Sequence, residues 1–136
     1  MSRENVEIVR QAFDAIAREG WQALIPLLDP EFELTTPPDL AMEPDTYRGE
    51  EGLRRYFESF EDVMEDIRIV PEGQFLDAGD KVFFEFRLTA RGKETGIEAG
   101  QRAFQVWTLR AGKGVRAEVF ASREDALAAA GLPPDS

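Results

Sequence analysis

The sequence predicts a single α+β domain, with helices in the first half of the chain and an antiparallel meander in the second. Apolar residues recur at spacings of three and four as far as about residue 66, and at alternate positions beyond it. Tight-turn sequences at 77–80 and 111–114 separate the later runs. The strands after residue 104 carry large apolar residues on both faces, so we expect both faces of the sheet to be covered.

Three helices are expected in the first half of the chain. The first, at about 4–18, has one apolar stripe, and Gly20 ends it. The second, at 21–28, is short and contains Pro26, which is unfavourable inside a helix. The third, at about 50–66, has the clearest periodicity and an unusually aromatic stripe. That stripe consists of Leu53, Tyr56, Phe57, Phe60, Val63, Met64 and Ile67.

The strands come mostly after the third helix. They are expected at 32–36, 68–76, 82–91, 97–110 and 115–121. The polar segment from Thr36 to Gly49 is rich in proline, which restricts the unfolded chain, so we expect an ordered rim or lid there. Ser122 and Gly131 stand where a short C-terminal helix would begin and end. No repeat or second boundary divides residues 1–136, which are close to the commonest size of one domain.

The composition excludes several classes of function. The 27 acidic and 16 basic residues give a net charge of −11, which repels the phosphates of nucleic acids. The chain has no histidine, so catalysis by a Ser–His or Cys–His pair is excluded. It has no cysteine, and no spacing of its carboxylates indicates a metal site. Acid–base chemistry would have to use carboxylates, tyrosine or lysine.

The chain also lacks the marks of a membrane or exported protein. No apolar run approaches the ~20 residues that span a bilayer. The first residues lack the basic start and apolar centre of a signal peptide. We therefore expect a cytoplasmic protein with no membrane partner.

Six stretches that cover nearly the whole chain carry a family resemblance: ENVEIVRQAFDAI, LLDPEFE, YRGEEGLRRYF, FLDAGDKVFFEFR, FQVWTLRAGKGVRAEVF and SREDALAAAGL. They resemble the SnoaL-like branch of the nuclear-transport-factor-2-like superfamily, which is close to the ketosteroid isomerases. The resemblance implies a cone in which a curved, mostly antiparallel sheet wraps around three N-terminal helices, followed by a short C-terminal helix. It also implies a pocket between sheet and helices, and a dimer through the outer sheet face. The superfamily hosts isomerases, cyclases, epoxide hydrolases, dehydratases and binding domains, so the fold does not fix the activity.

Two polar pocket candidates follow from this resemblance. Ketosteroid isomerases carry an oxyanion-hole aspartic acid on the strand before the last turn, and the matching position here is Gln105. Alternation along the strand then turns Gln101, Ala103 and Trp107 inward as well. The same counting turns Glu118 inward on the last strand, where a carboxylate is costly unless it is paired or protonated. The structural alternative for this carboxylate is an ion pair with Arg116, Arg102 or Arg123.

Aromatic residues supply the rest of the expected site. Tyr47, at the entry to the third helix, is a candidate to donate a hydrogen bond to a ligand oxygen. The alternative is a buried ring whose hydroxyl bonds to backbone. Core packing is likewise the alternative for the aromatic stripe of the third helix. The expected ligand-binding residues are Trp21, Phe13, Tyr56, Phe60, Phe84, Phe86, Trp107 and Phe120.

The chain departs from the known catalytic sets of these families. Thr36 stands near the position of the isomerase base, and Phe13 or its neighbour near that of the isomerase tyrosine. With Gln105 in the third position, steroid isomerisation by that mechanism is not expected. Epoxide hydrolases of this fold use an Asp-Arg-Asp set on inner strands, and the residues in that stretch here are Phe86 and Leu88.

Two functional hypotheses follow. In the first, the protein is a cofactor-independent isomerase, cyclase or hydrolase that acts on a small, apolar, oxygenated molecule. Glu118 would be its acid or base, and Gln105 and Tyr47 would polarise a carbonyl or hydroxyl. In the second, the protein is a non-catalytic dimeric domain that holds a hydrophobic molecule. The homodimer is expected to form through the outer sheet face, at Phe104, Val106, Glu85 and Arg87.

Overall fold

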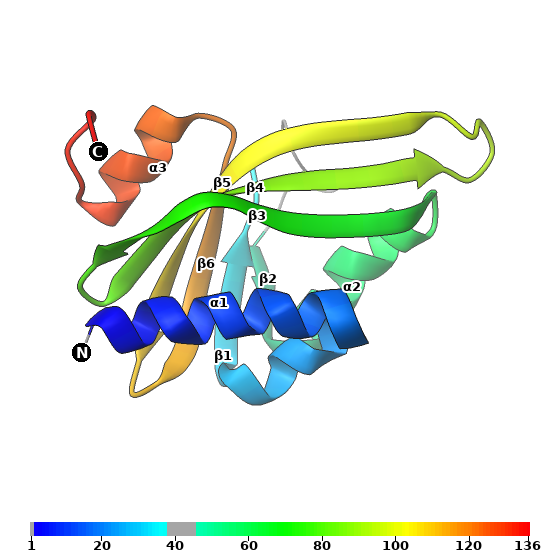
Figure 1. The fold of residues 1–136 in the computed structure, drawn as a ribbon. Helices are drawn as coiled ribbons and strands as arrows, with labels where there is room; N and C mark the ends of the chain where they lie inside the picture. The colour runs from blue at the N-terminus through cyan, green and yellow to red at the C-terminus, as the bar shows by residue number, and fades with distance from the viewer. Residues whose placement is uncertain (1, 38–45) are drawn as a thin grey trace.

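The computed structural model describes residues 2–37 and 46–136 and confirms the α+β fold. Six strands form one curved sheet in the order β2-β1-β6-β5-β4-β3 (Figure 1). Neighbouring strands are antiparallel except β1 and β6, which are parallel. The elements are α1 (Ser2–Glu19), the 3₁₀ helix η1 (Trp21–Leu27), β1 (Leu28–Thr35), β2 (Thr46–Arg48), α2 (Gly49–Glu61), β3 (Met64–Ala78), β4 (Lys81–Gly92), β5 (Glu98–Arg110), β6 (Lys113–Phe120) and α3 (Arg123–Ala130).

The first two helices lie close to their predicted bounds. The apolar stripe of α1 packs against the inner face of the sheet, where Val9, Ala12 and Phe13 are buried. The second helix is a 3₁₀ helix that contains Pro26. Proline lacks the backbone N–H that a longer α-helix would need there, and 3₁₀ geometry is common in such short pieces. Most of the expected proline-rich rim, 38–45, lies outside the described residues.

The third helix, α2, is shorter than the sequence predicts. The helical pattern was expected to continue to residue 66, but α2 ends at Glu61 and β3 begins at Met64. Met64 and Glu65 pair with Gly92 and Arg91 on β4, so strand pairing overrides the helical periodicity here. The sequence also did not predict β2, a three-residue strand that pairs with the end of β1.

Each face of the sheet carries its own apolar cluster. The inner cluster lies between the sheet and the three N-terminal helices. The outer cluster joins Phe83, Phe104 and Val106 to the apolar side of α3, so α1 and α3 lie on opposite sides of the sheet (Figure 1). The predicted caps of α3 are confirmed: the Ser122 hydroxyl accepts a hydrogen bond from the Asp125 amide at 3.3 Å, and Gly131 ends the helix in the left-handed region.

This outer cluster corrects the expected exposure of two residues. Phe104 and Val106 were expected to lie on an open dimer face, but they are 8% and 0% exposed because α3 covers them within the same chain. Glu85 and Arg87 do lie on the outer face, farther along β4, as predicted. Glu85 accepts ion pairs from Arg102, at 2.9 Å, and from Arg123 on α3, at 3.7 Å.

Within the part of the chain that the structure describes, no helix is both long enough and apolar enough to cross a membrane.

Candidate functional site

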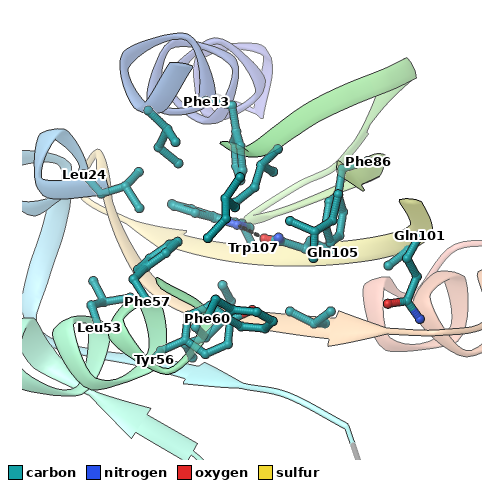
Figure 2. Close-up of a pocket in the computed structure, with 18 of the residues that line it drawn as sticks. Phe13, Leu24, Leu53, Tyr56, Phe57, Phe60, Phe86, Gln101, Gln105 and Trp107 are labelled. Carbon is teal, nitrogen blue, oxygen red and sulfur yellow. Dashed lines mark hydrogen bonds between the residues drawn. The ribbon is translucent and has the colours of Figure 1, made fainter. Parts of the chain in front are cut away.

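A narrow cavity lies between the inner face of the sheet and the N-terminal helices (Figure 2). The space open to the centre of a water-sized sphere is about 60 Å³, several times what one water molecule needs. Most of the lining is aliphatic or aromatic. The lining residues are Phe13, Ile16, Leu24, Phe32, Leu34, Leu53, Tyr56, Phe57, Phe60, Ile67, Ile69, Phe86, Leu88, Gln101, Ala103, Gln105, Trp107, Ala117 and Val119.

Strand β5 supplies the polar part of this lining. Gln101, Ala103, Gln105 and Trp107 all face the cavity, which confirms the alternation predicted for this strand. The Trp107 indole Nε1–H donates a hydrogen bond of 2.8 Å to the Gln105 carboxamide oxygen (Figure 2). Both residues are buried, whereas Gln101 is exposed. The cavity therefore opens to solvent at the Gln101 end and encloses Gln105 deeper inside.

Helix α2 supplies the aromatic wall opposite. The Tyr56 ring meets the rings of Phe57 and Phe60 edge to face, with centroids 5.1 and 5.2 Å apart. Such contacts fix ring positions and add to the stabilisation that burial provides. Burial raises the pKa of the Tyr56 phenol above its ordinary range, and the nearby Tyr47 adds to this shift. The phenol is therefore protonated at neutral pH and is available as a hydrogen-bond donor.

The structure brings five of the eight predicted ligand-binding residues to the cavity. Phe13, Tyr56, Phe60, Phe86 and Trp107 line it. Two others lie one layer behind the lining: the Trp21 ring stacks on Phe57 at 5.5 Å, and the Phe84 ring lies 4.9 Å from that of Phe13.

The prediction for Phe120 was wrong. This residue pairs with Phe104 across β5 and β6 and packs in the outer cluster, on the opposite face of the sheet.

Tyr47 is also placed differently from the prediction. It was expected at the rim of the pocket, but it is 0% exposed in the core and does not line the cavity. Its ring lies edge to face with Tyr56 at 5.2 Å, and the Arg55 guanidinium lies 4.4 Å from the ring centroid. Tyr47 sits on the short edge strand β2, opposite Leu34, so its ring is held between β1 and α2. Tyr47 therefore contacts the lining residue Tyr56 but not the cavity itself.

The inward orientation predicted for Glu118 was wrong, and a bulge in β6 is the reason. Gly114 pairs with Leu109 and faces inward, so strict alternation would also turn residues 116, 118 and 120 inward. The register shifts after Gly114, and Val115 is left without a partner on β5. Beyond the bulge Glu118 pairs with Val106, which belongs to the outer cluster. Glu118 therefore lies on the outer face, and its neighbours Ala117 and Val119 line the cavity.

Several lining residues were not nominated from the sequence. Phe57 belongs to the aromatic stripe that was recognised on the third helix, so the periodicity alone could have included it. Phe32 and Leu34 alternate on β1 and carry the ordinary signal of an inward strand face. The inward orientation of Ala117 and Val119 could not be predicted, because the sequence does not indicate the bulge that causes it.

The described lining carries no acidic or basic side chain. Its polar groups are the amides of Gln101 and Gln105, the Trp107 indole and the Tyr56 phenol. Over residues 2–37 and 46–136, no group of three or more potential metal-ligating side chains comes together. The described cavity can therefore hold an apolar molecule and donate hydrogen bonds to it, but it offers no group that takes up a proton at neutral pH.

Comparisons with known proteins agree with this architecture. A family described as a SnoaL-like domain matches residues 9–117. An NTF2-like protein from Burkholderia thailandensis E264 is 26% identical, with a TM-score of 0.77 over 94% of this chain and 97% of that chain. A putative SnoaL-like polyketide cyclase from Jannaschia sp. CCS1 is 20% identical, with a TM-score of 0.72 over 98% of this chain and 95% of that chain.

A third solved structure, of TerC co-crystallised with polyporic acid, is 20% identical with a TM-score of 0.76, and covers 98% of this chain and 99% of that chain. No curated protein sequence matches the chain. Because the family match extends over most of the chain, and the fold is the one these structures share, the chain belongs to the SnoaL-like family of the NTF2-like superfamily.

Proposed function

We propose that this protein binds a small, largely apolar and uncharged molecule in the cavity between the sheet and the helices. The observation that carries the proposal is the composition of the described lining, which is apolar apart from two amides, an indole and a protonated phenol. A charged ligand would lose its hydration there without gaining an opposite charge. An apolar ligand would gain by leaving water, and its few polar atoms would find hydrogen-bond partners.

The same composition favours binding over acid–base catalysis. The catalytic hypothesis assigned the proton transfer to Glu118, which lies on the outer face. The described lining offers no carboxylate, and the phenol of Tyr56 holds its proton at neutral pH. Among the solved structures with this fold, that of TerC was co-crystallised with a small molecule, polyporic acid, which supports a binding role for a protein of this architecture.

Binding can be tested with indane as a neutral apolar probe. We expect indane to bind, and its charged analogues 1-aminoindane and indane-2-carboxylate to bind at least about tenfold more weakly, because each would bury an unpaired charge. Saturation-transfer NMR detects binding of each probe. Trp107 lines the cavity, so its fluorescence should also change on binding.

A cavity-filling variant shows where the probe binds. Ala103→Leu adds volume at a lining position on β5 and should reduce the affinity for indane by about tenfold or more. Ala99→Leu makes the same change at an exposed position on the same strand and should leave the affinity unchanged. If indane does not bind, or if Ala103→Leu binds it as well as the unchanged protein does, the proposed function is wrong.

We further propose that two copies of the chain associate through the part of the outer sheet face that α3 leaves open. This face carries charges of both signs, and Arg102 lies between Glu72 and Glu85 at 3.4 and 2.9 Å. Next to these pairs, Arg87 is exposed and has no ion-pair partner among the described residues, and Val70 is 50% exposed. Such a mixed surface is complementary to itself in a twofold dimer, in which an arginine of one copy can meet a glutamate of the other.

Sedimentation velocity tests the dimer directly. Arg87→Glu should shift the protein toward monomer, because it turns an attractive charge of this face into a repulsive one. Lys93→Glu makes an equal change of charge in the β4–β5 turn and should leave the sedimentation coefficient unchanged. A monomeric unchanged protein at micromolar concentration would refute this association.

A further inference from the structure

We infer that Gln105 selects the ligand by its hydrogen-bonding type, because the Trp107 indole fixes the Gln105 amide with its NH2 group toward the cavity. The ligand then carries a hydrogen-bond acceptor at that point, such as a ketone, quinone or ester carbonyl oxygen, on an otherwise apolar body. This inference rests on the proposed binding function and adds to it the chemical class of the ligand.

The orientation of the Gln105 amide follows from the chemistry of its partner. An indole Nε1–H only donates, so the amide atom 2.8 Å from it must be the carbonyl oxygen. Reversing the amide would place two donors against each other and leave both unsatisfied. The usual ambiguity between oxygen and nitrogen in a glutamine side chain is therefore removed at this residue.

The indole itself is held firmly. Trp107 is 2% exposed, and its ring contacts those of Phe13 and Phe32, at centroid distances of 5.9 and 5.7 Å. On β6, Gly114 leaves no room beside the ring, since a Cβ atom there would lie 2.9 Å from Trp107. With the ring fixed on these sides, its N–H cannot turn away to release the amide.

The other end of the amide is available to a ligand. Gln105 is 8% exposed, and its one hydrogen bond among the described residues is the bond from Trp107. Every fully enclosed side-chain nitrogen or oxygen of the described residues has a partner. The unpaired Nε2 is therefore accessible from the cavity that Gln105 lines (Figure 2). An enclosed donor strongly favours a ligand that brings an acceptor. The free-energy cost of leaving a buried donor unpaired exceeds the net gain from an ordinary hydrogen bond.

The other polar groups of the described lining do not impose this choice. The Tyr56 hydroxyl can donate and accept, and the exposed Gln101 amide has no partner in the described chain that fixes its orientation. Gln105 alone among them presents a fixed donor. A ligand that offers an ammonium or amide N–H group to Gln105 would place one donor against another and bind poorly.

A pair of probes of the same shape tests this inference. 1-Indanone and 1-methyleneindane differ only in the exchange of a carbonyl oxygen for a CH2 group. We expect 1-indanone to bind about three- to tenfold more tightly, the effect of one hydrogen bond in an enclosed site. In the ¹⁵N–¹H spectrum, 1-indanone should shift the side-chain NH2 signals of Gln105, which are identified by their proximity to the Trp107 indole proton, and 1-methyleneindane should not.

Variants separate the role of the hydrogen bond that fixes the amide from the role of the NH2 group that donates to the ligand. Trp107→Phe removes the indole N–H and frees the amide to rotate, so the preference for 1-indanone should fall to about twofold or less. Gln105→Met removes the donor and should abolish the preference. Gln74→Met, the same substitution at an exposed position of β3, should preserve it.

The outcomes distinguish this inference from the proposed function. Equal affinity of the unchanged protein for both probes, without a shift of the Gln105 signals, would overturn the inference and leave the binding function standing. If neither probe binds, the binding function and the inference fall together. The spectrum of the unchanged protein decides the question even if a variant fails to fold.

Discussion

The two apolar clusters on opposite faces of β4 and β5 are built from the same strands but are closed in different ways. On the outer face, α3 presents Ala126, Leu127 and Ala130 to the sheet, and these small and medium side chains pack against Phe83 and Phe104. On the inner face, α2 presents the rings of Tyr56, Phe57 and Phe60, and a cavity remains between them and the sheet.

Both faces are covered by apolar side chains, yet only the inner face borders this cavity. A helix with small side chains can approach a sheet closely enough to fill the space between them. On the inner face the rings of α2 contact one another and leave space that no side chain fills. The outer cluster thus serves stability, and the inner one leaves room for a ligand.

Truncation of one ring on each face should reveal the largest difference in stability between the two clusters. Phe83→Ala, in the sealed outer cluster, should lower the free energy of unfolding by about 3–5 kcal/mol, because it creates a void among closely packed atoms. Phe60→Ala, at the edge of the existing cavity, should cost only about 1–2 kcal/mol. Urea denaturation measures both values. Equal losses would mean that the outer cluster is no better packed than the inner one.

A methyl group at Gly114 tests how tightly the inner cluster is packed away from the cavity. Gly114→Ala would place its Cβ atom 2.9 Å from Trp107 and 3.0 Å from Leu28, so we expect a loss of about 1–3 kcal/mol. Gly100→Ala is the matched control, because its nearest neighbour is the far end of the flexible Arg87 side chain, at 3.3 Å. Thermal unfolding compares the two variants, and a neutral Gly114→Ala would show that the Trp107 ring can move.

Alkaline pH should destabilise the folded protein through Tyr56. The Tyr56 phenol has a raised pKa in the folded protein and an ordinary pKa, near 10, in the unfolded chain. Above about pH 10 the unfolded chain releases this proton while the folded protein retains it, so stability falls as the pH rises. Urea denaturation between about pH 9 and pH 11.5 should show a shallower decline in Tyr56→Phe than in the unchanged protein. An identical decline in both would contradict the shift.

Much of the fold could be predicted from the sequence, because its elements agree with local rules. The stripe on α1, the caps of α3 and the alternation along β5 all lie where the pattern placed them. Gln105 and Trp107 could be assigned to the cavity because no bulge interrupts the register of β5 with β4, and one correctly placed residue orients the whole strand.

The errors share one physical origin, the effect of distant contacts on local patterns. The helical pattern at Met64 and Ile67 gave way to pairing with β4, and Ile67 lines the cavity from a strand instead. Phe104 and Val106 looked exposed because the sequence does not say where α3 docks. No feature of the sequence indicated the bulge at Val115, so Glu118 and Phe120 were assigned to the wrong face.

The bulge at Val115 also has a consequence for comparison within the family. A relative whose last strand lacks it has one residue fewer at this point. If the two sequences are aligned without a gap, the matched side chains beyond it face opposite ways. A carboxylate in the column of Glu118 would then lie inside the pocket of one protein and outside that of the other. The transfer of a catalytic role between such proteins therefore requires the strand register as well as the aligned residue.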